Sequence, residues 1–409
     1  MVKNVVTEKE KTSLIISEKL IFIYLLLFPL GQLIKVETVI LGFPIRVHPL
    51  DLIILTSIPI ALLAHYKTPT LLVKYLPFIY IAVFSLVLSV HLFNINNLVV
   101  GFLYLIRLVG YFYFFIVIAN YFLYINNNKI VVKKTLTQLI AVSAVTASIG
   151  WLQYIFFNDL RALKAFGWDD HLGRLAGSFL DPGYTGILLV LGALLTLWSY
   201  FKSKNKYFIA LFLYLIIAAL FTYSRAAYIS FIAGAAVLLV LEQKKKLIFT
   251  LIAAMLVALP FLPRPSSEGV KLERVFSVIQ RIDNYKETFT IIADNPLFGV
   301  GFNNMCLARG KYLNQQFFNS HSCSGSDSSL LFILATTGIS GLIAFITAII
   351  KSRNYIASEY RSLVLATFTS IIAHSFFSNS LFYSWVLGWF IVIVSISLKN
   401  GLIRGNRQH

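Results

Sequence analysis

Long apolar runs recur along almost the whole sequence, and they constrain its fold more than any other feature. Most of the runs span roughly 17–25 residues, the length that an α-helix needs to cross a bilayer core of about 30 Å. The chain is 58% hydrophobic and only 13% charged, whereas an ordinary soluble domain is about 25% charged. These 409 residues are therefore predicted to form a single all-α, polytopic membrane domain (1–409).

The apolar runs predict about twelve membrane-spanning helices. The first run lacks the small-residue exit of a signal peptide, so it is expected to be retained as a span. The expected spans are 20–34, 50–65, 75–93, 98–124, 135–157, 183–201, 207–223, 226–241, 247–263, 328–350, 362–378 and 381–398. A large hydrophilic segment separates the ninth span from the tenth.

The positions of Lys and Arg predict the orientation. If both termini are cytoplasmic, most of the 35 basic residues fall in the inner segments, such as 202–206 and 244–246, as the positive-inside rule requires. The net charge of +18 comes from these clusters, so it does not indicate a nucleic-acid partner. Segments 158–182 and 264–327 are then expected on the exterior side.

The segment 264–327 contains a predicted amphipathic helix. Apolar residues from Leu272 to Ile292 recur at helical spacing, which predicts a helix lying on the membrane or on the bundle. Arg274 and Arg281 are seven residues apart and are expected to share its polar face.

Both cysteines of the chain, Cys306 and Cys323, lie in the same exterior segment. An oxidising exterior allows a disulfide closing 17 residues, worth roughly 3 kcal/mol by loop entropy. Two unpaired thiols fit the spacing equally well, so both alternatives stay open.

Three exterior arginines are candidates for binding phosphate. Arg225 lies where two spans meet with almost no loop, and Arg174 and Arg281 lie in the exterior segments. Arg presents a planar fork of donors that matches phosphate oxygens. The alternatives are a snorkelling side chain at a tight hairpin for Arg225, and a structural or solvated role for the other two. Arg107 lies inside a span, where it needs a partner in the bundle or the substrate.

A histidine and an aspartate precede the tenth span, in the stretch NSHSCSGSDSSLLF. The structural interpretation is a helix start capped by Ser326 or Asp327. The functional interpretation makes His321 or Asp327 a base that takes a proton from an acceptor hydroxyl.

The stretch WDDH offers Asp169, Asp170 and His171 as metal ligands. Adjacent side chains splay apart in most conformations, so a solvated acidic turn is the alternative. No metal and no other cofactor are expected.

Five segments together resemble the O-antigen ligase and O-antigen polymerase superfamily of bacterial membrane glycosyltransferases. They are LYLIRLVGYF (103–112), RLAGSFLDPGYTG (174–186), TYSRAAYIS (222–230), RIDNYKETFTIIADNPLFGVGFNN (281–304) and LLFILATTGISGL (330–342). They match family segments in the same order and on the same predicted side. The resemblance implies a GT-C-like fold with a large exterior loop between spans nine and ten.

The resemblance also implies the chemistry. A glycan passes from an undecaprenyl diphosphate carrier to a glycan or lipid A–core hydroxyl at the periplasmic face of the cytoplasmic membrane, without nucleotide sugar or metal. Arg174, Arg225 and Arg281 would bind the diphosphate, with Tyr184 and Ser224 in supporting positions.

The base position departs from the ligase pattern. Family ligases usually carry His-Asn eleven residues before the first Gly of the Thr-Gly step, and here that position holds Asp327, followed by Ser328. Some polymerase-like members share this feature, so the sequence does not separate polymerase from ligase. Asp327 is the aligned base, and His321 is a nearby substitute.

A transporter or flippase of the same lipid-linked glycan is the rival interpretation. Transporters usually carry paired repeats and helices broken at mid-membrane, and the sequence shows neither. A scaffold without catalysis would give no reason for the exterior arginines.

Overall fold

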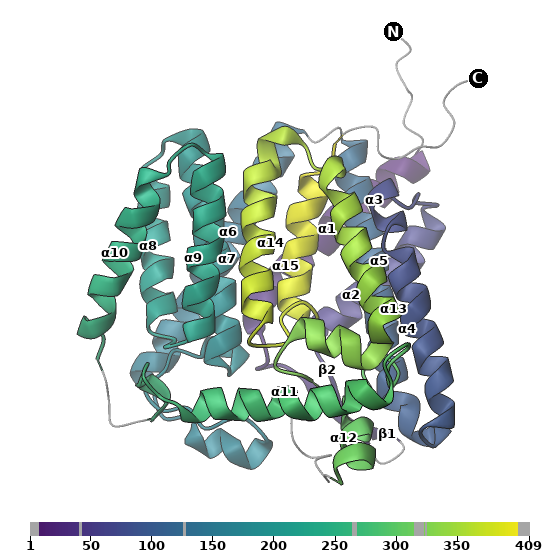
Figure 1. Cartoon of the computed structure of the whole chain (residues 1–409). Helices are drawn as coiled ribbons and strands as arrows, with labels where there is room; N and C mark the ends of the chain where they lie inside the picture. The colour runs from purple at the N-terminus through teal and green to yellow at the C-terminus, as the bar shows by residue number, and fades with distance from the viewer. Residues whose placement is uncertain are drawn as a thin grey trace.

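The computed structural model describes residues 8–40, 43–125, 128–263, 268–314, 323 and 325–399, and Figure 1 shows a bundle of helices. The helices are α1 (Glu8–Leu27), α2 (Pro49–Leu63), α3 (Thr70–Val73), α4 (Leu76–Leu88), α5 (Val99–Tyr124), α6 (Lys129–Phe156), α7 (Pro182–Ser203), α8 (Tyr207–Leu220), α9 (Arg225–Leu241), α10 (Lys246–Ala258), α11 (Phe276–Asp294), α12 (Met305–Leu313), α13 (Ser329–Ser352), α14 (Arg361–Ser375) and α15 (Ser384–Ile396). The strands are β1 (Val36–Ile40) and β2 (Phe43–Val47).

The centre of the bundle is α7, whose side chains are almost all buried. It packs against α6, α8, α9 and α14, and α9 in turn packs along α14. Small residues permit this close approach, as they do in other membrane helices. A Cβ atom added to Gly186 would lie 2.7 Å from the Cβ of Ala227, and one added to Gly192 would lie 2.3 Å from the Ser143 hydroxyl. Steric complementarity therefore fixes the relative positions of these helices.

Each of the twelve apolar segments predicted from the sequence contains a helix in the structure. Five helical segments of the described chain are long and apolar enough to cross a membrane: Lys11–Leu30, Ile95–Tyr124, Lys129–Phe156, Pro182–Ser203 and Ser329–Tyr355. The all-α membrane fold is therefore confirmed. That all twelve segments span a bilayer stays a prediction.

The described residues of the two predicted exterior segments lie at one end of the bundle. Figure 1 shows α11 lying across this end, with α12 and the hairpin of β1 and β2 beside it. The strands pair antiparallel, with Val36 opposite Val47. Because α7 and α9 begin at this end, the basic connections 202–206 and 242–246 lie at the opposite end. This separation agrees with the predicted orientation.

The predicted exterior helix begins later than expected. Its first residue is Phe276, so Leu272 and Arg274 precede the helix. The expectation that Arg274 and Arg281 share one face of α11 is therefore wrong. Arg274 donates instead to the carbonyl oxygens of Gly269 and Lys271, at 2.6 and 2.9 Å, and these contacts stabilise a turn before the helix.

The glycine turn after α11 docks into a break in α13. Val300 donates its backbone N–H to the Ala335 carbonyl oxygen at 2.9 Å. Gly338 interrupts the helical conformation of α13 with φ 67° and ψ −173°, a combination essentially restricted to glycine. A Cβ atom at Gly338 would lie 2.2 Å from the Leu297 carbonyl group. The turn after α11 and the break at Gly338 thus meet backbone to backbone, and this contact anchors α11 to the bundle.

Candidate functional site

The turn between α8 and α9 organises the arginines at this end of the bundle. Arg174 is buried, and its Nε donates to the Thr222 carbonyl oxygen at 2.9 Å. Its Nη2 donates to the Tyr223 carbonyl oxygen at 3.4 Å. Ser224 caps the N-terminus of α9 with its side-chain oxygen, and Arg225 is the first residue of that helix. The Thr-Tyr-Ser-Arg motif therefore positions two arginines at once.

Arg225 reaches from α9 to the segment that leads into α11. Its Nη1 donates to the carbonyl oxygens of Leu272 and Arg274, at 3.2 and 3.1 Å. Its Nη2 donates to the Ser277 hydroxyl at 2.7 Å. The Arg274 side chain turns back and donates to the Tyr223 carbonyl oxygen at 3.3 Å. These contacts hold the start of α11 against the α8–α9 turn.

Arg174, Arg225, Arg274 and Arg281 form what we call the arginine cluster. Arg274 lies within electrostatic range of the other three, and Arg225 within range of Arg281. Burial and mutual repulsion lower the pKa of Arg174 and of Arg274 to about 10. All four donate to neutral oxygens, Arg281 to the Phe377 carbonyl at 3.3 Å. In the described part of the chain none pairs with a carboxylate within 4 Å. The cluster thus keeps its positive charge.

The polar face of α11 points toward the bundle. The residues on this face are Arg281, Asn284, Tyr285 and Thr288, three or four positions apart. Asn284 Oδ1 accepts the backbone N–H of Asp327 at 2.9 Å. The apolar residues Phe276, Ile279, Ile282 and Phe289 are exposed. This inversion of the usual soluble arrangement agrees with a helix that meets lipid on one face and the site on the other.

Asp327 lies beside the arginine cluster with its carboxylate unpaired among the described residues. Burial raises its pKa, while Arg281 and Arg309 oppose the shift. Asp181 lies within electrostatic range and adds to the rise. A half-buried carboxylate with a raised pKa and nearby cations has the properties of a general base.

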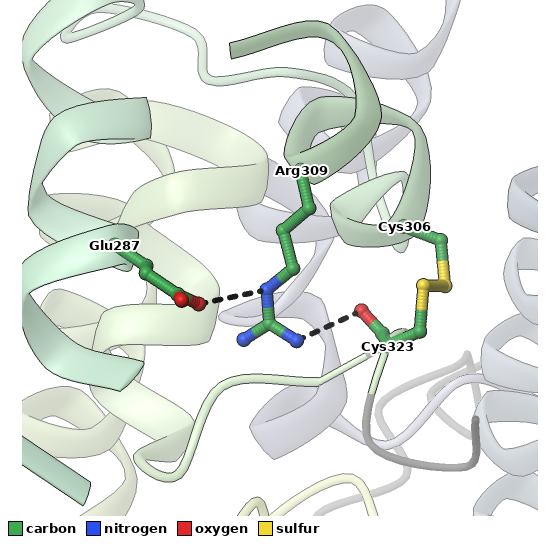
Figure 2. Close-up of a disulfide and its surroundings, with 4 residues drawn as sticks. All are labelled: Glu287, Cys306, Arg309 and Cys323. Carbon is green, nitrogen blue, oxygen red and sulfur yellow. Dashed lines mark hydrogen bonds and ion pairs between the residues drawn. A yellow bond between two sulfur atoms is a disulfide. The ribbon is translucent and has the colours of Figure 1, made fainter. Parts of the chain in front are cut away.

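A disulfide between Cys306 and Cys323 supports this segment (Figure 2). Of the two alternatives left open by the spacing, the structure contains the disulfide. Arg309 of α12 donates its Nη1 to the Cys323 carbonyl oxygen at 3.4 Å, and its Nε lies 3.7 Å from Glu287 Oε2 of α11. The disulfide and Arg309 together tie α12 to α11 and to the segment that ends at Asp327.

Arg107 has a structural partner. Its Nη2 lies 2.8 Å from Asp51 Oδ2 of α2, and its guanidinium lies over the Tyr104 ring, 4.8 Å from the centroid. Asp51 is buried, so this ion pair satisfies a carboxylate inside the bundle. Of the two alternatives for Arg107, the structure favours the partner within the bundle.

Three further predictions concern Tyr184, His321 and the N-cap of α13. Tyr184 stacks on Tyr383 with centroids 3.8 Å apart and lies within electrostatic range of Asp327. His321 lies outside the described residues. The predicted cap of α13 is wrong, because Ser328 and not Ser326 or Asp327 accepts the capping hydrogen bond. Asp327 is therefore not occupied with capping.

Three residues at this end were missed by sequence reasoning. Arg274 was assigned only to a helix face, although it connects the other arginines. Asp181 appeared only inside the resembling segment 174–186. The Asp-Pro pair was the available signal, since Asp181 is the N-cap of α7 and Pro182 its first residue. His374 is fully buried, with Nδ1 2.5 Å from the Ser380 hydroxyl. No sequence pattern marked it.

The WDDH stretch contributes two of its three predicted ligands to a cluster. Potential ligand atoms of Asp169, His171 and Asp181 all lie within 4.8 Å of one another. Asp170 lies instead near Lys164, 3.9 Å away. Burial and Arg174 lower the pKa of His171 to about 4, so its ring is neutral at pH 7. Of the three WDDH side chains, Asp169 and His171 therefore belong to this cluster and Asp170 does not, and Asp181 is the third member.

An integral membrane protein with arginines and carboxylates gathered at one end of its bundle is the class that this fold and site define. Residues 209–346 match the family model described as O-Antigen ligase. The match covers α8 to most of α13, including the arginine-bearing turn and α11, and it supports membership of the chain in the O-antigen ligase and polymerase family. The match confirms the resemblance over residues 209–346, which contain three of the five motif segments, 222–230, 281–304 and 330–342. A comparison with curated proteins finds none that matches.

Proposed function

We propose that the protein is an inverting glycosyltransferase that polymerises or ligates a surface glycan carried on undecaprenyl diphosphate. The observation that carries the proposal is the arginine cluster, whose four guanidinium groups lie together and donate only to neutral oxygens. Like charges held together repel one another, so the arrangement favours a ligand with several negative charges. A diphosphate fits this requirement. The family match supports a transferase that acts on such a lipid-linked glycan.

The arginines would act on the leaving group. As the bond between the anomeric carbon and the diphosphate oxygen breaks, negative charge grows on that oxygen. Guanidinium groups fixed by Thr222, Tyr223 and Ser277 need little reorganisation to meet it, and such preorganised charge is usually the largest catalytic contribution.

Asp327 would act on the acceptor. Its carboxylate takes the proton from an acceptor hydroxyl as the oxygen attacks the anomeric carbon from the side opposite the diphosphate. One displacement of this kind inverts the anomeric centre. The raised pKa of Asp327 makes the carboxylate a stronger base than an exposed aspartate. His321 stays an alternative base.

Transfer by the purified protein in detergent tests the proposal. The assay supplies a defined undecaprenyl diphosphate-linked oligosaccharide, with and without lipid A–core, and resolves product length on a gel. A ladder without lipid A–core identifies a polymerase, and a single shifted band that requires it identifies a ligase. A flippase would give neither product, since detergent leaves no second compartment. Absence of any transfer by folded protein would reject the proposal.

A further inference from the structure

The loop that carries Asp169 and His171 is held by backbone hydrogen bonds and lies beside the start of α7. Asp159 and Leu172 form an antiparallel bridge, and Leu160 donates its N–H to the His171 carbonyl oxygen at 2.8 Å. Asp181 is fixed by its capping role, since its Oδ1 accepts the Tyr184 N–H at 2.9 Å. The loop and the N-terminus of α7 thus bring the side chains of Asp169, His171 and Asp181 close together.

The His171 ring carries an unsatisfied nitrogen. The residue is only 8% exposed, and its Nε2 is buried without a hydrogen-bond partner in the described part of the chain. An unsatisfied buried polar atom destabilises the folded state. Native proteins rarely leave such an atom without a bound partner. The ring lies among two carboxylates, Asp169 and Asp181, whose ligand atoms are within 4.8 Å of its own.

We propose that Asp169, His171 and Asp181 form a binding site for one divalent cation, Mn²⁺ or Zn²⁺. Two carboxylates and one imidazole supply the mixed oxygen and nitrogen ligands that these ions accept. Bonds of about 2.1 Å place neighbouring ligands roughly 3–3.5 Å apart. The cluster therefore contracts slightly on binding, and the exposed Asp169 side chain is free to move.

The surrounding charges are compatible with such an ion. Arg174 and Arg274 lie within electrostatic range of His171 and oppose a cation. Arg174 is, however, held by the α8–α9 turn through its bonds to two carbonyl oxygens. Asp327 lies within range of both site carboxylates and adds a third negative charge. The ion would therefore occupy the acidic side of a site whose other side is the arginine cluster.

Three protein ligands leave coordination positions for water or another oxygen. If the proposed function holds, a diphosphate oxygen of the donor is the group placed to fill one of them. This last role depends on the proposed function, whereas binding of the ion does not.

Binding of Mn²⁺ to the full chain, in detergent and without any glycan donor, tests the site. Chelator-treated protein is titrated with Mn²⁺ while the electron paramagnetic resonance signal of the free ion is recorded, and Zn²⁺ is added as a competitor. We expect one saturable site per chain, with Zn²⁺ displacing Mn²⁺. Asp169→Asn and His171→Asn should each weaken binding at least tenfold.

Two further variants complete the test, one as a control and one as a third ligand substitution. Asp170→Asn removes the neighbouring exposed carboxylate, which lies near Lys164, and should leave the affinity unchanged. Asp181→Asn keeps a capping side chain at the start of α7 and should still lose binding. The proposal is overturned if the protein shows no saturable site, or if Asp169→Asn and Asp181→Asn bind as tightly as Asp170→Asn does. Since Asp169 is exposed, its variant remains informative even if His171→Asn fails to fold.

Discussion

Arg174 and Arg274 donate to the same acceptor, the carbonyl oxygen of Tyr223, at 3.4 and 3.3 Å. The turn between α8 and α9 therefore connects an arginine of the first exterior segment, Arg174, to an arginine of the second, Arg274. Tyr223 adopts a left-handed conformation with φ 50°, and its ring hydroxyl donates to the Pro263 carbonyl oxygen. This turn is the structural centre of the proposed diphosphate site.

Replacement of Arg274 should weaken donor binding. Arg274→Gln removes one charge-assisted contact worth about 1.5–3 kcal/mol, so we expect a roughly 10- to 100-fold rise in the dissociation constant of the lipid diphosphate. Arg274→Lys keeps the charge but loses the planar guanidinium, so its dissociation constant should lie between those of the unmodified protein and Arg274→Gln. Binding is measured by calorimetry in detergent.

The control for Arg274 is Arg161→Gln. Arg161 lies in the other exterior segment and is exposed, with its charge paired to Asp159 at 2.7 Å. The Arg161→Gln variant should bind the donor with the same dissociation constant as the unmodified protein. Unchanged affinity in Arg274→Gln would remove this residue from the site.

Asp327 should set the acid limit of activity. A base must be ionised, and the raised pKa of Asp327 means that activity is lost on acidification at a higher pH than the value of about 3.9 for a free aspartate. Asp327→Asn should lower kcat by about 10²–10⁴ and abolish this limb of the pH profile.

The matched variant for Asp327 is Asp283→Asn. Asp283 is exposed on α11 and lies 3.4 Å from Lys286, so its loss should change neither kcat nor the acid limb. An acid limb that persists in Asp327→Asn would assign the base to another residue, with His321 the first to examine.

Gly338 should tolerate no side chain. Gly338→Ala places a Cβ against the Leu297 carbonyl group and forces a conformation that alanine avoids, which costs about 1–3 kcal/mol for the backbone alone. We expect a lower melting temperature in detergent. Gly325→Ala adds a methyl group where no atom lies within 4 Å and should melt normally. Equal melting of the two variants would contradict the docking of the glycine turn.

Arg107 should affect stability and not donor binding. Arg107→Met leaves the buried Asp51 carboxylate without its cation, and breaking a buried pair costs about 3–5 kcal/mol. Adding Asp51→Asn should restore much of the lost stability, because the remaining buried charge is then removed. A weaker donor affinity in the folded double variant would instead place Arg107 in the substrate site.

The apolar pattern of the sequence was sufficient to predict the helices. The length of an apolar run predicts a helix that can cross a bilayer. Each of the twelve predicted segments contains a helix. Basic clusters predict which end of the bundle is cytoplasmic, and the exterior location of segments 158–182 and 264–327 stays a prediction. The motif segments also pointed to the family whose model matches residues 209–346, and three of the five lie within that match.

Which side chains meet depends on the packing of the elements. Arg274 joins the arginine cluster because the chain before α11 turns back onto the α8–α9 turn. Asp181 joins His171 because α7 begins beside the loop. Arg107 pairs with Asp51 across two helices. Such contacts depend on how helices pack and how exterior segments fold over their ends, and linear spacing contains no measure of distances between separate elements.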